Sequence, residues 1–151
     1  FLLGKFMPPH AGHMTLIRAA RTLVDELTVL VCWLPDDTIA GATRLAWMRE
    51  LCPDCRVVGH GDVVPQTPEE SPDFWPIWRG IVAAAHPESI DYLFAGEDYG
   101  GELARQVGGL YVPLGGRVLG LADDPVAGLS ASAVRADPAA HWAYLPASVQ
   151  A

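Results

Sequence analysis

The sequence predicts an α/β fold, a doubly wound parallel sheet of about five strands with helices on both faces. Short apolar runs rich in β-branched residues alternate along the 151-residue chain with amphipathic runs of helical period. The run 27–33 is apolar almost throughout, as expected of a strand buried on both faces of a parallel sheet. The length is that of one domain, which we assign to residues 1–151.

The expected elements follow the chain in order. Strands are predicted at 1–3, 27–33, 56–59, 91–95 and 110–112, and helices at 14–24, 43–51, 79–86, 102–107 and after Ser130. Residues 60–72 form a loop rich in proline and glutamate that is too long for a plain connector, and such loops often carry function. Residues 115–128 form a second loop, whose sequence indicates little about its role. The strand at 91–95 ends in a turn rich in glycine and acidic residues, where open α/β sheets bind ligands.

The charge balance excludes some classes of partner. A net charge of −8 argues against a nucleic-acid partner, because phosphate backbones need a basic surface. No stretch reaches the ~18 apolar residues of a membrane span, so we expect no membrane partner. The chain holds one lysine, Lys5, and nine arginines, so a site for anionic substrates must gather its few cations locally.

Three cysteines do not form a disulfide framework, and a reducing, cytoplasmic location fits them best. Cys52-Pro53-Asp54-Cys55 has the C-x-x-C spacing of redox sites and of half a zinc site. The chain has no second pair, and the segment lies between a helical run and a strand-like run rather than at the start of a helix. We therefore expect these cysteines to be structural or incidental.

The first strand runs directly into the segment Gly4–His13. A strand that turns at once into a helix points free backbone N–H groups at a ligand, and the helix dipole favours negative charge there. Gly12 allows close approach, and the imidazoles of His10 and His13, with Lys5, complete an anion site suited to a polyphosphate. The alternatives are a helix cap and a metal pair. Metal pairs usually have i,i+4 spacing and no acidic third ligand is near, so we expect no metal held by the protein.

This segment resembles the first signature of the nucleotidyltransferase superfamily, which has a Rossmann-like fold. Its residues are Gly4-Lys5-Phe6-Met7-Pro8-Pro9-His10-Ala11-Gly12-His13. The second signature of that superfamily is matched by Leu129-Ser130-Ala131-Ser132-Ala133-Val134-Arg135, with serine at 132 where threonine is usual. Two motifs in the right order at opposite ends of the chain make chance co-occurrence a poor explanation.

Imidazoles, a lysine, serines and an arginine, with no placed nucleophile, suit a transfer that has no covalent intermediate. An incoming phosphate attacks the α-phosphorus of a nucleoside triphosphate, and pyrophosphate leaves. Because the attacker is already an anion, the reaction needs no general base. Catalysis is then positioning and neutralisation of charge, shared by Mg²⁺ that is bound mainly through the triphosphate.

Within the superfamily, the closer resemblance is to the nicotinamide mononucleotide adenylyltransferase domain of NadR-type proteins, and it covers nearly the whole chain. It implies transfer of AMP from ATP to nicotinamide mononucleotide, giving NAD and pyrophosphate, and it leaves homo-oligomerisation open. It implies catalytic roles for His10, His13, Lys5 and Arg135, ATP binding by Gly4, Phe6, Gly96, Asp98, Ser130 and Ser132, and mononucleotide binding by Arg44, Trp75 and Trp78. Trp78, rather than Trp75, would stack on the nicotinamide ring.

Two other functions stay open: transfer to another phosphate acceptor, such as phosphopantetheine or a polyol phosphate, and non-catalytic sensing of a nucleotide or NAD. The tryptophans and Arg44 argue against the first. Arg44 lies in the first turn of its predicted helix, where the helix dipole disfavours a cation. We therefore expect its side chain to contact either solvent or an anionic ligand. The sequence begins at Phe1 without an initiator methionine, so we expect a fragment of a longer bifunctional protein. Because Lys5 is the only lysine, we expect no P-loop kinase site within these residues.

Overall fold

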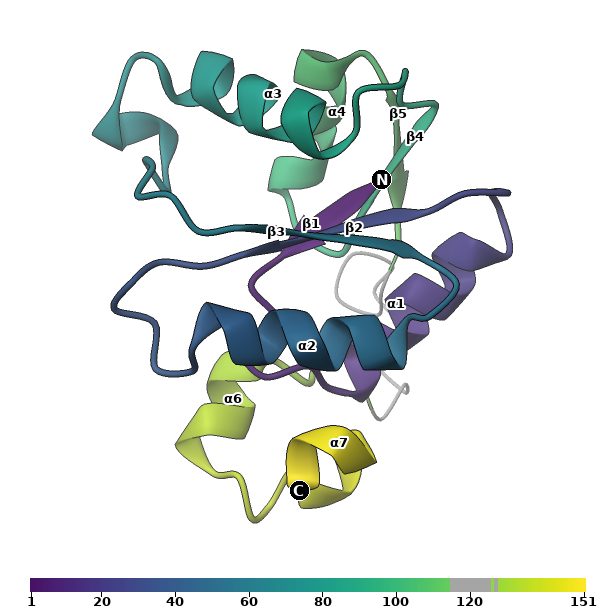
Figure 1. Ribbon diagram of the computed structural model, residues 1–151, viewed down its shortest axis with the longest axis vertical. Helices are drawn as coiled ribbons and strands as arrows, with labels where there is room; N and C mark the ends of the chain where they lie inside the picture. Colours follow the sequence, from purple (N-terminus) through teal and green to yellow (C-terminus); the bar gives the residue numbers. More distant parts are fainter. Residues whose placement is uncertain (115–125, 127) are drawn as a thin grey trace.

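The computed structural model describes residues 1–114, 126 and 128–151 (Figure 1). Its strands are β1 (Leu2–Gly4), β2 (Thr28–Cys32), β3 (Arg56–His60), β4 (Tyr92–Ala95) and β5 (Leu110–Pro113). Its helices are α1 (Ala11–Arg21), α2 (Gly41–Leu51), α3 (Phe74–Ala85), α4 (Tyr99–Val107), α6 (Ala131–Ala136) and α7 (Ala147–Gln150), with short 3-10 helices η1 (Pro68–Glu70) and η2 (Trp142–Tyr144). The predicted loop 115–128 lies outside the described residues except for Val126 and Gly128. Among the described residues, no helix combines the length and apolar character needed to cross a bilayer.

The strands are parallel and fall into two hydrogen-bonded sheets that meet at Phe1. One sheet has the order β1-β2-β3, and the other pairs β4 with β5. The backbone nitrogen of Phe1 donates to the Tyr92 carbonyl at 2.8 Å, and the Phe1 carbonyl accepts from the Phe94 N–H at 2.8 Å. The spatial order is therefore β3-β2-β1-β4-β5, and its direction reverses between β1 and β4. Sheets of this kind bind ligands at the carboxyl ends of the strands at such a reversal.

Helices cover both faces of the sheet, because alternate strand residues point to opposite sides. Val29 and Val31 of β2 belong to the core formed with α1 and α2, whereas Leu30 and Cys32 of the same strand belong to the core formed with α3 and α4. Figure 1 shows α1 and α2 below the sheet and α3 and α4 above it. The predicted α/β architecture is confirmed. The strands form two hydrogen-bonded sheets rather than one because, among the described residues, the backbone hydrogen bonds that join β1 to β4 are those of Phe1.

Four helices begin earlier than their apolar pattern predicts. α2 begins two residues earlier, α1 and α4 begin three residues earlier and α3 begins five residues earlier than expected. Their first turns carry glycine, proline or polar residues, which weaken the pattern without preventing a helix. Pro76, for example, lies in the first turn of α3, where a backbone N–H has no partner within the helix. The tryptophan pair therefore stands at the start of a helix and not in the loop before it.

Candidate active site

One cavity of about 850 Å³ lies at the carboxyl ends of β1 and β4, where the strand order reverses. This volume is in the range of small-molecule sites. The predicted site residues that line it are Gly4, Lys5, Phe6, His10, His13, Trp75, Trp78, Gly96, Asp98, Ser130, Ser132 and Arg135. The structure describes every predicted site residue, and of these only Arg44 lies away from the lining. Folding thus brings the two motif segments and the tryptophan pair to one cavity.

The β1–α1 loop (residues 5–10) is shaped by the packing of its own aromatic rings. Phe6 has a positive φ of 47°, and its side chain is buried. A Cβ at Gly4 would lie 3.2 Å from the Phe6 ring, and a Cβ at Gly12 would lie 3.1 Å from the His10 ring. Such contacts are too tight without a shift of the rings. Both glycines of the first motif therefore make room for neighbouring rings, and Gly12 also lines the cavity.

His10 and His13 stack on each other at the start of α1. Their ring centroids are 3.7 Å apart, and the ring planes are inclined by 31°. The Nδ1 atom of His13 accepts a hydrogen bond from the backbone N–H of His10 at 3.3 Å, so the proton of the neutral His13 ring lies on Nε2. His13 is therefore a fixed donor. The Nδ1 atom of His10, in contrast, is buried and has no hydrogen-bond partner within the described residues.

Both imidazoles are neutral at neutral pH. Burial lowers the pKa of His10 to about 4, and burial together with the neighbouring His10 lowers the pKa of His13 to about 3. Both rings therefore bind an incoming anion as neutral hydrogen-bond donors. The dipole of α1 adds to this attraction: its first turn has no acidic residue, and its last turn carries Arg18 and Arg21. The arrangement suits phosphate oxygens.

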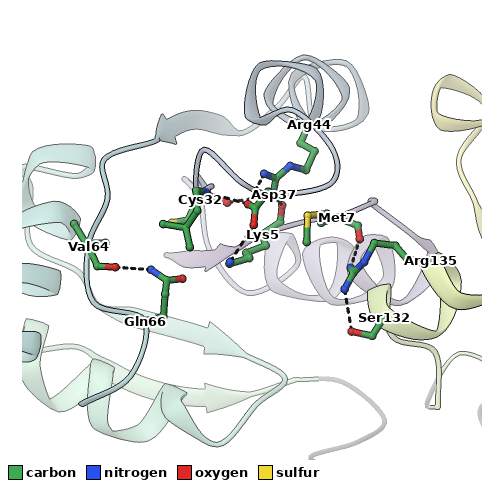
Figure 2. Close-up of polar contacts among 10 residues, drawn as sticks. Lys5, Met7, Cys32, Asp37, Arg44, Val64, Gln66, Ser132 and Arg135 are labelled. Atoms are coloured by element: carbon green, nitrogen blue, oxygen red, sulfur yellow. Dashed lines mark hydrogen bonds and ion pairs between the residues drawn. The ribbon is translucent and has the colours of Figure 1, made fainter. Parts of the chain in front are cut away.

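The second motif contacts the first across 128 residues of sequence. The NH1 group of Arg135 donates to the Met7 carbonyl at 2.5 Å, and its NH2 group donates to the Ser132 hydroxyl oxygen at 3.2 Å (Figure 2). Ser130 caps α6, because its hydroxyl oxygen accepts from the Ala133 N–H at 3.1 Å. The exposed guanidinium of Arg135 therefore both holds the β1–α1 loop and faces the cavity.

Arg44 has neither of the environments expected for it. Its side chain is fully buried, and its guanidinium donates through NH1 to the Lys5 carbonyl at 2.7 Å and through NH2 to Asp37 Oδ2 at 2.6 Å (Figure 2). The cation in the first turn of α2 thus has an internal carboxylate and a carbonyl as its partners, not solvent or an anionic ligand. A direct contact with a mononucleotide would require this network to open.

Trp75 and Trp78 reach the cavity from α3, which lies above the sheet in Figure 1, whereas α6, the helix that contains Arg135, lies below it. The indole N–H of Trp78 donates to the Pro65 carbonyl at 2.9 Å. Trp75 stands edge-on to Phe74, with ring centroids 4.9 Å apart and ring planes at 83°. The loop 60–72 therefore supports one of the two rings.

Sequence reasoning missed Asp37, Gln66 and Tyr99. Gln66 lines the cavity, and its amide nitrogen donates to the Val64 carbonyl at 2.9 Å. Tyr99 also lines the cavity, and its hydroxyl donates to the Leu3 carbonyl at 3.1 Å, which ties the turn after β4 to β1. The long loop and the turn rich in glycine and acidic residues were both signals, but neither singled out these side chains. Asp37 lies in no recognisable motif.

Cys52 and Cys55 lie in the turn after α2, away from the cavity lining. Burial raises the pKa of Cys52 to about 12 and also raises the pKa of Cys55, so both are protonated thiols at neutral pH. Within the described residues, no three His, Cys, Asp or Glu side chains come close enough together to hold a metal ion. A structural role for the two cysteines stays a prediction.

The structure is similar to that of a NadR protein solved in complex with NAD and AMP-PNP, with a TM-score of 0.65 over 95% of this chain and 19% sequence identity. This similarity shows a shared fold, and the matched region is 43% of the length of that protein. A comparison with curated proteins found no significant match. The family model named cytidylyltransferase-like matches residues 1–136, a span that includes all five described strands and both motif segments. Because this match takes in most of the 151 residues, the chain belongs to the cytidylyltransferase-like family of nucleotidyltransferases.

Proposed function

We propose that this domain transfers AMP from ATP to nicotinamide mononucleotide and releases NAD and pyrophosphate. The observation that carries the proposal is the single cavity that joins the histidine pair, Lys5 and Arg135 to Trp75 and Trp78. The first group suits the phosphates of a nucleotide, and the second suits a planar base. The NadR protein of similar fold was solved with NAD, the proposed product, and with AMP-PNP, an analogue of the proposed donor, which supports the proposal.

In the proposed reaction, a phosphate oxygen of the mononucleotide attacks the α-phosphorus of ATP. A new phosphorus–oxygen bond forms, the bond to the bridging oxygen breaks, and pyrophosphate leaves with the bonding electrons. The His13 Nε2–H group and the neutral His10 ring donate to oxygens on which negative charge grows, and Lys5 and Arg135 neutralise the leaving group. These residues act by positioning and by electrostatic stabilisation, which is the usual basis of phosphoryl transfer.

We propose that Mg²⁺ reaches the site with the triphosphate. The described residues contain no group of three acidic or other metal-binding side chains, and Mg²⁺ commonly binds through substrate phosphates with few protein ligands. The ion would supply further neutralisation of phosphate charge. Asp98, at the cavity lining beside the start of α4, is exposed and is available for the adenosine ribose.

We propose that the acceptor side of the cavity takes an amide in preference to an acid. One N–H of the Gln66 amide is bonded to the Val64 carbonyl, so the side chain can offer a ligand its oxygen as an acceptor and its second N–H as a donor. That oxygen can accept from the carboxamide of nicotinamide but not from a carboxylate. Among the described lining residues, the Lys and Arg side chains are Lys5 and Arg135, which we assign to the phosphates. We therefore propose that the mononucleotide is preferred over its deamidated acid.

The test is to incubate the protein with ATP, Mg²⁺ and nicotinamide mononucleotide, and to follow NAD and pyrophosphate together. Parallel reactions contain nicotinic acid mononucleotide, phosphopantetheine or glycerol phosphate as acceptor, and CTP in place of ATP. We expect NAD in a 1:1 ratio with pyrophosphate. Faster turnover of phosphopantetheine or glycerol phosphate would replace the proposed acceptor, and nucleotide binding without any turnover would favour a sensor.

A further inference from the structure

Asp37, in the segment between β2 and α2, carries a largely buried carboxylate with three donors around it. It accepts from the Leu34 N–H at 3.0 Å. It also accepts from Arg44 at 2.6 Å and from the Lys5 ammonium at 3.3 Å (Figure 2). Its side chain is 8% exposed. Burial alone would raise the pKa of Asp37, but the Leu34 N–H, Arg44 and Lys5 together lower it below its ordinary value. The carboxylate is therefore ionised at neutral pH.

Arg44 completes the network from the other side. Its NH1 group donates to the carbonyls of Lys5 at 2.7 Å and of Cys32 at 3.4 Å, and its Nε atom is buried without a partner in the described part of the chain. A buried guanidinium needs an opposite charge nearby, and Asp37 supplies it. Neither Asp37 nor Arg44 lines the cavity, although both contact Lys5, which does.

Lys5 is thus held at two points. Arg44 holds the Lys5 carbonyl, and Asp37 holds the Lys5 ammonium. The Lys5 side chain remains 41% exposed at the cavity. An ammonium has three donors, so one bond to Asp37 leaves two for an anion. We propose that Asp37 and Arg44 are positioning residues, which hold the Lys5 ammonium toward the phosphates of the bound nucleotide. This inference rests on the role proposed above for Lys5.

The alternative roles for the pair fit the contacts less well. If Arg44 bound the nucleotide itself, its carbonyl bonds would break and the Asp37 carboxylate would lose its main partner. If Asp37 held a metal ion, the ion would lie next to two cations and outside the cavity lining. Both residues are better placed to act through Lys5.

The first experiment compares Asp37→Asn in the wild-type and Lys5→Ala backgrounds, with NAD formation as the readout. In the wild-type background we expect kcat/KM to fall by about 10- to 100-fold, the range known for residues that orient the ligands of a metal site. In the Lys5→Ala background the same substitution should have little further effect, because the group that it positions is gone. Asp36→Asn is the matched control, since Asp36 is the exposed neighbour and should leave kcat/KM unchanged in both backgrounds.

The second experiment uses the fact that the chain contains a single lysine. Isotope labelling of lysine gives one set of side-chain NMR signals, those of Lys5. We expect slow, ordered Cε motion in the wild type and in Asp36→Asn, and fast motion typical of a free surface lysine in Asp37→Asn. Arg44→Lys, which keeps the charge but not the forked geometry, should release Lys5 in part. This second substitution keeps the test available if Asp37→Asn folds poorly.

An equal loss of kcat/KM in both backgrounds would overturn the proposal, because Asp37 would then act independently of Lys5. A Lys5 side chain that stays ordered in folded Asp37→Asn or Arg44→Lys protein would also overturn it. A wild-type protein that makes no NAD would refute the proposed reaction instead. In that case the NMR signals, recorded with and without AMP-PNP, still decide whether Asp37 orders Lys5.

Discussion

The β1–α1 loop side and the tryptophan side of the cavity differ in how firmly their groups are held. Two guanidiniums, from Arg44 and Arg135, donate to carbonyls of the loop, and His13 accepts a backbone N–H within it. On the other side, Trp78 makes one hydrogen bond to a loop carbonyl, and Trp75 is placed mainly by ring contacts. Polar groups that are fixed in advance stabilise a transition state, whereas an apolar surface mostly binds the ground state. Substitutions on the first side should therefore lower kcat, and those on the second should raise KM.

The largest effect is expected for the histidine pair. Replacing His10 or His13 by alanine should lower kcat by about 100- to 1,000-fold, as for other lost transition-state donors. Single-turnover NAD formation at saturating substrate would measure this directly. A folded variant with normal kcat and raised KM would show that this side is a binding surface as well, and the contrast between the two sides would fail.

A smaller effect, of the opposite kind, is expected for the tryptophans. Trp78→Ala should raise KM for the mononucleotide, because stacking of a base on an aromatic ring is worth about 1–3 kcal/mol, and it should leave KM for ATP nearly unchanged. Trp75→Ala is the matched comparison. If Trp75→Ala has this signature and Trp78→Ala lacks it, the stacking role belongs to Trp75. A loss of kcat in both would contradict the contrast.

The two sides should also differ in how stability depends on pH. The pKa values of His10 and His13, about 4 and 3, lie below the ordinary value of 6.5, so the folded state binds fewer protons than the unfolded state between these values. Stability is therefore present above about pH 6.5 and lost as pH falls toward 3, by up to about 1.4 kcal/mol per pH unit for each histidine. Thermal unfolding from pH 7.5 to 4 should show a shallower slope in His10→Asn/His13→Asn, and an unchanged slope in Trp78→Phe. Equal slopes in all three proteins would disprove the linkage.

The smallest effect is expected away from both sides. Cys52→Ala/Cys55→Ser should keep wild-type kcat and KM, because neither cysteine lines the cavity. Metal analysis of the purified protein gives the second readout, and we expect no stoichiometric zinc in either protein. Zinc that is present in the wild type and lost in the double variant would show that the turn after α2 is a metal site.

The sequence by itself determined the fold class and the segments that form the cavity. Strand and helix patterns repeat within about ten residues, and the Gly4–His13 turn is built from neighbours in sequence, so local chemistry carried both predictions. Helix starts were predicted late, because polar and proline-containing first turns hide the period. The cavity-lining residues Gln66 and Tyr99 were not predicted individually. The composition of their segments indicated a functional loop or turn, but it did not indicate which position contacts the cavity.

Only the tertiary structure decided what the two arginines contact. Arg44 meets Lys5 across 39 residues, and Arg135 meets Met7 across 128. No local sequence pattern predicts these contacts, because they depend on how β1, β2 and the last motif pack together. From the sequence, the guanidinium of Arg44 could have faced solvent, a ligand or a buried carboxylate. In the folded protein Arg44 is buried against Asp37, because a charge removed from water needs an opposite charge inside the protein.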